Sequence, residues 1–147
     1  MKMNTLVTER LNLTLMNDQD GPQLYEKTCW GLWQVTVTQS DLFIGYLLVK
    51  PMDLFTELPD FNHIEIGWRL KPESQGNGYA TEAAKVLCDE ISKQKNVTTI
   101  SATADKNNAA SIKVMEKLGM HFIKNYTQKE QSGEVASVLY SKNINNE

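Results

Sequence analysis

Apolar and polar residues alternate in several segments of the chain, and this alternation predicts β-strands. Residues 11–15 read Leu-Asn-Leu-Thr-Leu, and residues 34–38 and 63–70 alternate in the same way. A period of two places the apolar side chains on one face of a sheet. Residues 43–49 are almost continuously apolar and predict a buried strand, in which Gly45 indicates a bulge or a close neighbour. Further strands are predicted at 97–104, 121–126 and 135–140.

A spacing of three and four residues replaces this alternation in two segments and predicts helices. Residues 78–93 carry one apolar stripe, and residues 108–118 carry another, followed by Gly119 in a position that suits a left-handed residue. Residues 17–29 begin with two N-cap residue types and predict a short helix. Residues 52–61, with prolines near both ends, are expected to form a loop. The resulting order of strands and helices predicts an α+β domain with one central sheet.

The composition places the chain among ordinary globular proteins. Its 147 residues, 41% of them hydrophobic, predict one domain that spans residues 1–147. We expect no transmembrane helix, because no apolar run approaches about 18 residues, and no secretory signal, because residues 1–10 are polar. Cys29 and Cys88 are then expected to be reduced thiols of a cytoplasmic protein.

The net charge of −3 argues against a nucleic-acid partner, which requires a basic surface. It leaves room for a small anion, because backbone N–H groups alone can hold a phosphate. Residues 75–81 offer such groups. Their sequence, Gln-Gly-Asn-Gly-Tyr-Ala-Thr, lies between a predicted strand and a predicted helix, where glycines let a ligand approach the backbone. A tight turn without a ligand is the alternative, whereas a P-loop is excluded because no Lys-Ser/Thr pair follows.

Residues 75–80 fit the Gln/Arg-x-x-Gly-x-Gly/Ala signature of the GNAT superfamily of acyl-CoA-dependent N-acyltransferases, which this chain resembles. Residues 107–120 are similar to the Asn-x-x-Ser helix of that family and the Glu-Lys-Leu-Gly-Met that follows it. Residues 8–11, 65–68 and 79–83 resemble the branch that contains the ribosomal-protein N-terminal acetyltransferases. The resemblance implies a mixed, mostly antiparallel central sheet, flanked by helices, with a splayed central strand pair.

The resemblance also implies acetyl-CoA as co-substrate, with no metal, and it implies which residues hold it. The pyrophosphate would contact the glycine-rich loop and the helix start, at Gln75, Gly76, Asn77, Gly78, Tyr79, Ala80 and Thr81. The pantetheine arm would pair with the preceding strand, at Ile66, Gly67, Trp68, Arg69 and Leu70. Asn108 and Ser111 would complete the site from the second helix.

Glu65 is the candidate general base, because it lies on the strand that would carry the thioester; a solvated glutamate is the alternative. Ser111 is the candidate acid or stabiliser of the thiolate, and a helix-start serine bonded to the backbone is its alternative. Many relatives have a tyrosine on this helix, and this chain has none there. Tyr140 is a second choice for the acid.

Other polar and aromatic residues have weaker claims. His63 and His121 are expected to be strand histidines satisfied by a neighbour, not metal ligands or bases, because no partner has ligand spacing. Trp30 and Trp33 could line an acceptor pocket, although such aromatics more often belong to the core. Fewer than 20 residues separate the first strand from Gln34, where relatives commonly have two helices. We therefore expect an open acceptor cleft, or one completed by residues 52–61 or by a partner subunit.

The sequence thus predicts an enzyme that transfers an acetyl group from acetyl-CoA to a primary amine by direct attack. A peptide or protein N-terminal α-amine is the first candidate acceptor, and a small-molecule amine is the second. A non-catalytic acyl-CoA sensor is the alternative outside enzymes. The expected protein is a monomer or homodimer with no nucleic-acid or membrane partner.

Overall fold

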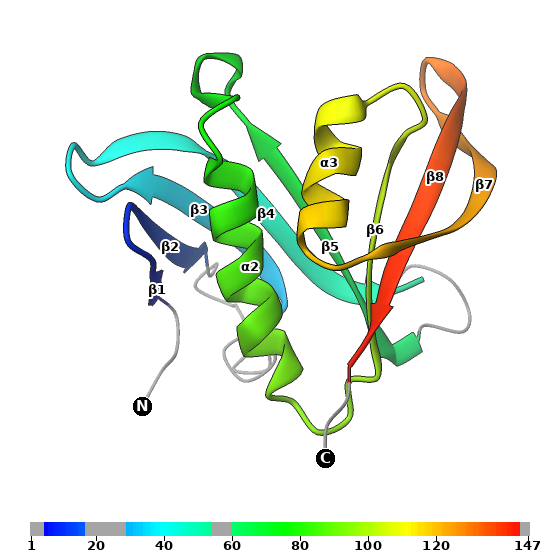
Figure 1. Ribbon diagram of the computed structural model, residues 1–147, viewed down its shortest axis with the longest axis horizontal. Helices are drawn as coiled ribbons and strands as arrows, with labels where there is room; N and C mark the ends of the chain where they lie inside the picture. The colour runs from blue at the N-terminus through cyan, green and yellow to red at the C-terminus, as the bar shows by residue number, and fades with distance from the viewer. Residues whose placement is uncertain (1–4, 17–28, 54–59, 145–147) are drawn as a thin grey trace.

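The structure, a computed structural model, describes residues 5–16, 29–53 and 60–144 and contains one eight-stranded sheet with the order β1-β2-β3-β4-β5-β6-β8-β7 (Figure 1). The strands are β1 (Thr5–Val7), β2 (Leu11–Met16), β3 (Gly31–Val37), β4 (Leu42–Met52), β5 (Asp60–Leu70), β6 (Thr99–Asp105), β7 (His121–Glu130) and β8 (Gly133–Asn143). The helices are η1 (Pro72–Ser74), α2 (Tyr79–Ser92) and α3 (Ala109–Lys117). The α+β class and the central sheet are therefore confirmed.

The predicted strands and both long helices are present, with differences at their ends. β1 and the short η1 were not predicted, because three residues are too few to show a period. β7 and β8 extend beyond the predicted ranges as a hairpin, and Lys129 pairs with Glu134 near its tip. Backbone pairing alone holds this tip, whose side chains are exposed, so no apolar pattern marks it. The helix predicted over residues 17–29 lies outside the described residues except for Cys29.

The middle of the sheet is splayed, as predicted. Among the described strands, β5 and β6 form the one parallel pair, and its paired positions are His63–Thr99, Ile64–Ile100 and Glu65–Ser101. β5 continues through Leu70 while pairing with β4 on its other side. Figure 1 shows that β5 and β6 diverge toward the end of the molecule that carries η1 and the beginning of α3. On the side that faces β6, the backbone of residues 66–70 therefore has no strand partner among the described residues.

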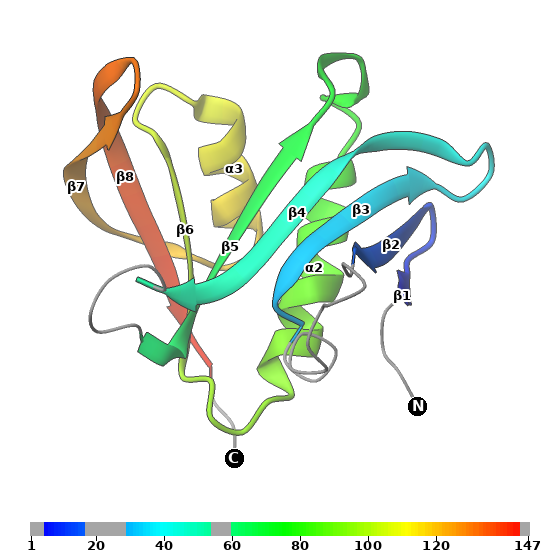
Figure 2. The same ribbon diagram turned by 180° about the vertical axis from the view of Figure 1, so that it is seen from behind.

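Both helices cover one face of the sheet, and Figure 2 shows the strands in front of them when the molecule is seen from behind. The apolar stripe of α2 is buried against this face, as the period predicted. Its buried residues are Ala83, Ala84, Leu87, Cys88 and Ile91. They pack in one core with residues of alternate sheet positions, among them Leu11, Leu13, Trp33, Val35, Ile44, Leu47, Ile64, Ile66 and Ile100. Neither helix in this described part of the chain has the length and apolar character to cross a membrane.

Gly45 confirms the close approach that the sequence predicted. Val35 pairs with Gly45 and Thr36 with Phe43, so the chain is bulged at Ile44. A Cβ atom on Gly45 would lie 2.2 Å from the carbonyl oxygen of Arg69, inside van der Waals contact. β4 therefore needs a glycine opposite Leu70, where it pairs with the C-terminal end of β5, next to the loop that follows.

Candidate functional site

The glycine-rich loop exposes the start of α2, because Gly76 and Gly78 have no side chains to cover it; the Arg10 guanidinium lies beside it, with Nη2 3.4 Å from where a Cβ atom of Gly78 would be. Gly76 and Gly78 have φ angles of 82° and 80°, in the left-handed region that favours glycine. Gly78 is the N-cap of α2 and has no side chain to accept from the first turn. The N–H groups of that turn therefore face outward with the positive end of the helix dipole, an arrangement that suits an anion.

Two polar side chains of the loop hold the loop itself. The amide of Gln75 donates to the carbonyl oxygen of Leu70 at 3.2 Å, and the amide of Asn77 donates to the carbonyl oxygen of Ser74 at 3.2 Å. Gln75 and Asn77 were predicted as ligand-binding residues. Both side chains therefore stabilise the loop. The backbone N–H of Gln75 donates to the carbonyl oxygen of Pro72 at 3.2 Å, so of these two residues Asn77 is the one whose backbone N–H is left for a phosphate.

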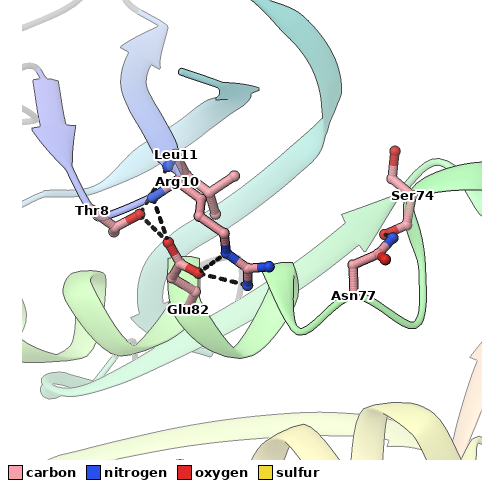
Figure 3. Close-up of polar contacts among 6 residues, drawn as sticks. All are labelled: Thr8, Arg10, Leu11, Ser74, Asn77 and Glu82. Atoms are coloured by element: carbon pink, nitrogen blue, oxygen red, sulfur yellow. Dashed lines mark hydrogen bonds and ion pairs between the residues drawn. The ribbon is translucent and has the colours of Figure 1, made fainter. Parts of the chain in front are cut away.

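A cluster of three residues, Thr8, Arg10 and Glu82, fixes the first turn of α2 to the turn between β1 and β2 (Figure 3). Glu82 accepts from the Thr8 hydroxyl at 2.5 Å and from the backbone N–H of Arg10 at 3.0 Å. The Arg10 guanidinium pairs with Glu82 at 2.7 Å and lies over the Tyr79 ring, 4.6 Å from its centre. Burial raises the pKa of Glu82, but the bonds from Thr8 and Arg10 outweigh it and lower that pKa below its ordinary value. The sequence did not predict this contact, because it joins residues 8 and 10 to residue 82, far apart in the chain.

Replacing Glu82 with alanine is expected to lower the free energy of unfolding by about 2 kcal/mol, because it removes hydrogen bonds to a charged, mostly buried group. Urea denaturation at pH 7 measures this. The loss should shrink as the pH falls through the lowered pKa of Glu82, since the protonated side chain no longer makes these bonds in the wild type. The exposed Glu116 of α3 offers the control Glu116→Ala, expected to stay within about 0.5 kcal/mol. Equal effects of the two substitutions would contradict the role of the cluster.

Glu65 lies on the sheet face opposite the helices, as the alternation of β5 predicted. Ile64 and Ile66 are buried in the core, whereas His63, Glu65 and Gly67 are half-buried on the other face. A cavity of about 650 Å³ opens on that face, where β5 and β6 part. Its lining comes from five strands and from Asp53, which follows β4. The polar side chains in the lining include charged groups of both signs and are Lys50, Asp53, His63, Glu65, Thr103, Lys124, Tyr126 and Gln128.

Lys50 lines this cavity and contacts Glu65, although the sequence pattern did not predict a functional role for it. Its Nζ atom lies 2.8 Å from Oε1 of Glu65, and both side chains are about a quarter exposed. The pair follows from the β4–β5 register, in which Lys50 lies opposite Glu65. Glu65 is therefore neither isolated nor fully solvated, and its second carboxylate oxygen, Oε2, is the one left for a ligand. Its role as base stays a prediction.

His63 has the neighbour that the sequence analysis expected of it. Its Nε2 atom is hydrogen-bonded to the hydroxyl of Ser101, and Ser101 is bonded to the hydroxyl of Ser141. Ser101 is completely buried. Burial lowers the pKa of His63 and outweighs the opposite effect of Asp60 and other nearby carboxylates. His121, the other histidine, is exposed on β7.

The start of α3 brings Asn108 and Ser111 together. Asn108 is the N-cap, and its Oδ1 atom accepts from the backbone N–H of Ser111 at 3.1 Å. The Asn108 side chain is exposed, so its amide nitrogen can still donate to a ligand. The predicted role of Ser111 is untested. Tyr140 packs against Phe122 with 5.8 Å between ring centres and is not among the residues that line the cavity.

The remaining candidates belong to the interior. Trp33 is fully buried, and Trp30 is half-buried and stacked on Phe61, so the core alternative holds for Trp33. Cys29 and Cys88 are buried free thiols, and burial raises the pKa of each to about 11. Within the described ranges, no three His, Cys, Asp or Glu side chains gather in a way that could hold a metal ion.

Comparison with known proteins places these features in a family. The family model described as an acetyltransferase (GNAT) domain matches residues 9–121. The Bacillus subtilis protein named "Uncharacterized N-acetyltransferase YnaD" is 43% identical over 86 residues, which are 58% of this chain and 47% of that protein. The chain spans about half the length of the curated relatives it matches.

Two solved structures share the fold. A ribosomal-protein-S5-alanine acetyltransferase from Vibrio fischeri has a TM-score of 0.75 at 17% identity and covers 97% of each chain. RimL, a ribosomal L7/L12 alpha-N-protein acetyltransferase in complex with coenzyme A, has a TM-score of 0.71 at 14% identity, covering 95% of this chain and 97% of its own.

Proposed function

Because the chain belongs to the GNAT acetyltransferase family, we propose that it transfers an acetyl group from acetyl-CoA to a primary amine, first of all a peptide or protein N-terminal α-amine. One observation carries the proposal. The open first turn of α2, behind a left-handed Gly78, lies at the end of β5 where the sheet is splayed. An anion site and an unpaired strand edge therefore adjoin each other, as a ligand with a pyrophosphate and a long amide-bearing arm requires.

Different parts of acetyl-CoA would contact the helix start and the strand edge. Its pyrophosphate would accept from the backbone N–H groups of residues 76–81, with no positive charge needed. Its pantetheine amides would pair with the free edge of residues 66–70, like an added strand. Asn108 could donate to the same arm from α3, and Ser111, one turn into that helix, would face the sulfur. The thioester would then lie near Glu65, beside the cavity.

The acceptor would enter from the open face of the sheet, through the cavity that Glu65 lines. An attacking amine must be neutral. At pH 7 a lysine side chain costs about 4.6 kcal/mol to deprotonate, and an α-amine only about 1 kcal/mol. We propose Glu65 as the group that receives the α-ammonium, with Oε2 as the contact and Oε1 held by Lys50. The names of the two ribosomal-protein acetyltransferases support this choice of acceptor.

Two alternatives have an observation behind them. The cavity volume, about 650 Å³, together with its charged groups of both signs, would suit a small zwitterionic amine. The absence of a tyrosine on α3 favours an acyl-CoA sensor that does not turn over. A single domain, a cytoplasmic location and a monomeric or homodimeric state stay predictions from the sequence.

Release of free CoA thiol separates these possibilities. The full chain is mixed with acetyl-CoA and one acceptor at a time: peptides with a free α-amine, the same peptides Nα-acetylated but containing lysine, polyamines, and free amino acids. We expect thiol release with the free α-amine peptides and none with their Nα-acetylated forms. Release with small amines alone would favour a small-molecule amine as the acceptor. Binding of CoA without release for any acceptor would overturn the enzyme in favour of the sensor.

A further inference from the structure

We propose that the proton lost by the acceptor amine ends on His63, and that the buried hydroxyls of Ser101 and Ser141 hold the imidazole in the tautomer that can take it. This inference rests on the proposed function and adds a second proton acceptor to Glu65. As the amine nitrogen bonds to the acetyl carbon, the carbon–sulfur bond breaks and its electron pair leaves on the CoA sulfur. The amine proton passes to Nδ1 of His63 by way of Glu65 or a water.

His63 has the right place for this step. It lies two residues before Glu65 on β5, on the same face, and both line the cavity. Both belong to the last paired stretch of β5 and β6, directly before the strands part. One oxygen of the Glu65 carboxylate is already bonded to Lys50. The His63 imidazole beside it therefore offers a second group that can accept a proton.

The hydrogen bonds through Ser101 and Ser141 define which nitrogen of the His63 ring carries the proton. A neutral imidazole has one donor and one acceptor nitrogen, whereas an imidazolium has two donors. If the Nε2–H group donates to Ser101, which donates to Ser141, then Nδ1 is the acceptor, and protonation leaves every bond of this chain in place. In the reverse arrangement Nε2 accepts a hydrogen bond from the Ser101 hydroxyl, and that bond must break when the ring is protonated. The hydrogen-bonded chain His63–Ser101–Ser141 therefore fits a histidine that gains a proton and returns it.

The surroundings keep His63 neutral at pH 7. Burial is the largest effect on it and lowers its pKa, so the uncharged base is the resting form. The charged and titratable groups that face it from the neighbouring elements are both acidic and basic. Those among the described residues are Lys50, Asp53, Asp60, Glu65, Lys124 and Tyr126.

Nitrogen-15 NMR of the two histidines tests the tautomer without any need for turnover. At neutral pH we expect the Nε2–H form for His63, with Nδ1 unprotonated. We expect Ser101→Ala to shift the His63 spectrum toward a tautomer mixture, while the exposed His121 keeps its own spectrum. An Nδ1–H tautomer for His63 in the wild type overturns the proposal whether or not the chain is active.

The pH dependence of turnover, with a free α-amine peptide, tests the proton transfer. We expect His63→Gln, which can still bond to Ser101, to lower kcat about 100-fold. We also expect it to remove the rise in kcat below pH 6.5, leaving only the rise near pH 8 that belongs to the α-amine. His121→Gln is the matched control and should leave both unchanged. Loss of CoA binding in His63→Gln would indicate a structural role instead.

The outcomes separate the two proposals. Wild-type kcat and pH profile in a folded His63→Gln variant would overturn the role of His63 and leave the proposed function standing. No thiol release by the wild type with any acceptor would overturn the proposed function, and with it the role of His63 in that reaction. A lost low-pH rise together with the Nε2–H tautomer would support both.

Discussion

Replacing Gly78 with valine is expected to weaken CoA binding at least 100-fold while the protein stays folded. Gly78 has φ 80° at the N-cap of α2, where a β-branched residue is strained by about 1–2 kcal/mol. Valine would rotate the loop out of this conformation and place its methyl groups before the N–H groups of the first turn. Isothermal titration calorimetry with CoA measures the affinity directly.

Gly119 provides the matched control. It has φ 87° after the end of α3, and a Cβ atom there would have no neighbour within 4 Å. Gly119→Val should therefore bring a similar backbone strain and a similar loss of stability, without a loss of CoA affinity. Unchanged affinity in Gly78→Val would remove the loop from the phosphate site. Equal losses in both variants would mean that general destabilisation, and not the loop, lowers the affinity.

Replacing Gly45 with alanine is expected to have the largest effect on stability, a loss of about 3 kcal/mol or more. The added Cβ would lie 2.2 Å from the carbonyl oxygen of Arg69 and 2.7 Å from the Cα atom of Leu70. Both are backbone atoms that cannot rotate away, so β4 and β5 must separate. Because overpacking a core commonly costs about 1–3 kcal/mol and domains are stable by only about 5–15 kcal/mol, we expect a marginal or unfolded protein. Urea denaturation followed by circular dichroism measures the loss.

Gly67 is the control for this substitution. It lies on β5 in the same sheet, and a Cβ atom there would have no neighbour within 4 Å. Gly67→Ala should change the free energy of unfolding by no more than about 0.5 kcal/mol. If Gly45→Ala were as stable as Gly67→Ala, the close approach of β4 and β5 would not be needed for folding.

Features that depend on residues close together in the chain could be predicted from the sequence. The stripe of α2 and the alternation of β5 depend on local periods, and the predicted ranges end within a few residues of the observed ones. The glycine-rich loop was predictable for the same reason, since a left-handed Gly78 and a helix start are adjacent in the chain. Gly45 was notable because a glycine stands alone in an apolar strand.

Features that depend on register could not be predicted. Lys50 meets Glu65 only because β4 and β5 pair with one particular offset, which a bulge and a loop length set. Ser101 meets His63 across the parallel pair, and no local pattern marks either residue. Thr8, Arg10 and Glu82 lie in segments whose sequence resembles the family. Their contact could not be predicted, because it requires the turn between β1 and β2 to lie against α2.

The splay has a consequence for the order in which the chain folds. β1 to β5 follow one another along the sheet, so most of that half is built from contacts between near neighbours in the sequence. β6, β8 and β7 form a second group, and in the described part of the chain the strand pairing that joins the two groups is three parallel residue pairs of β5 and β6. Parallel pairing across an intervening helix has high contact order and forms slowly. We therefore expect the two half-sheets to dock late in folding, along the same seam that the co-substrate would occupy.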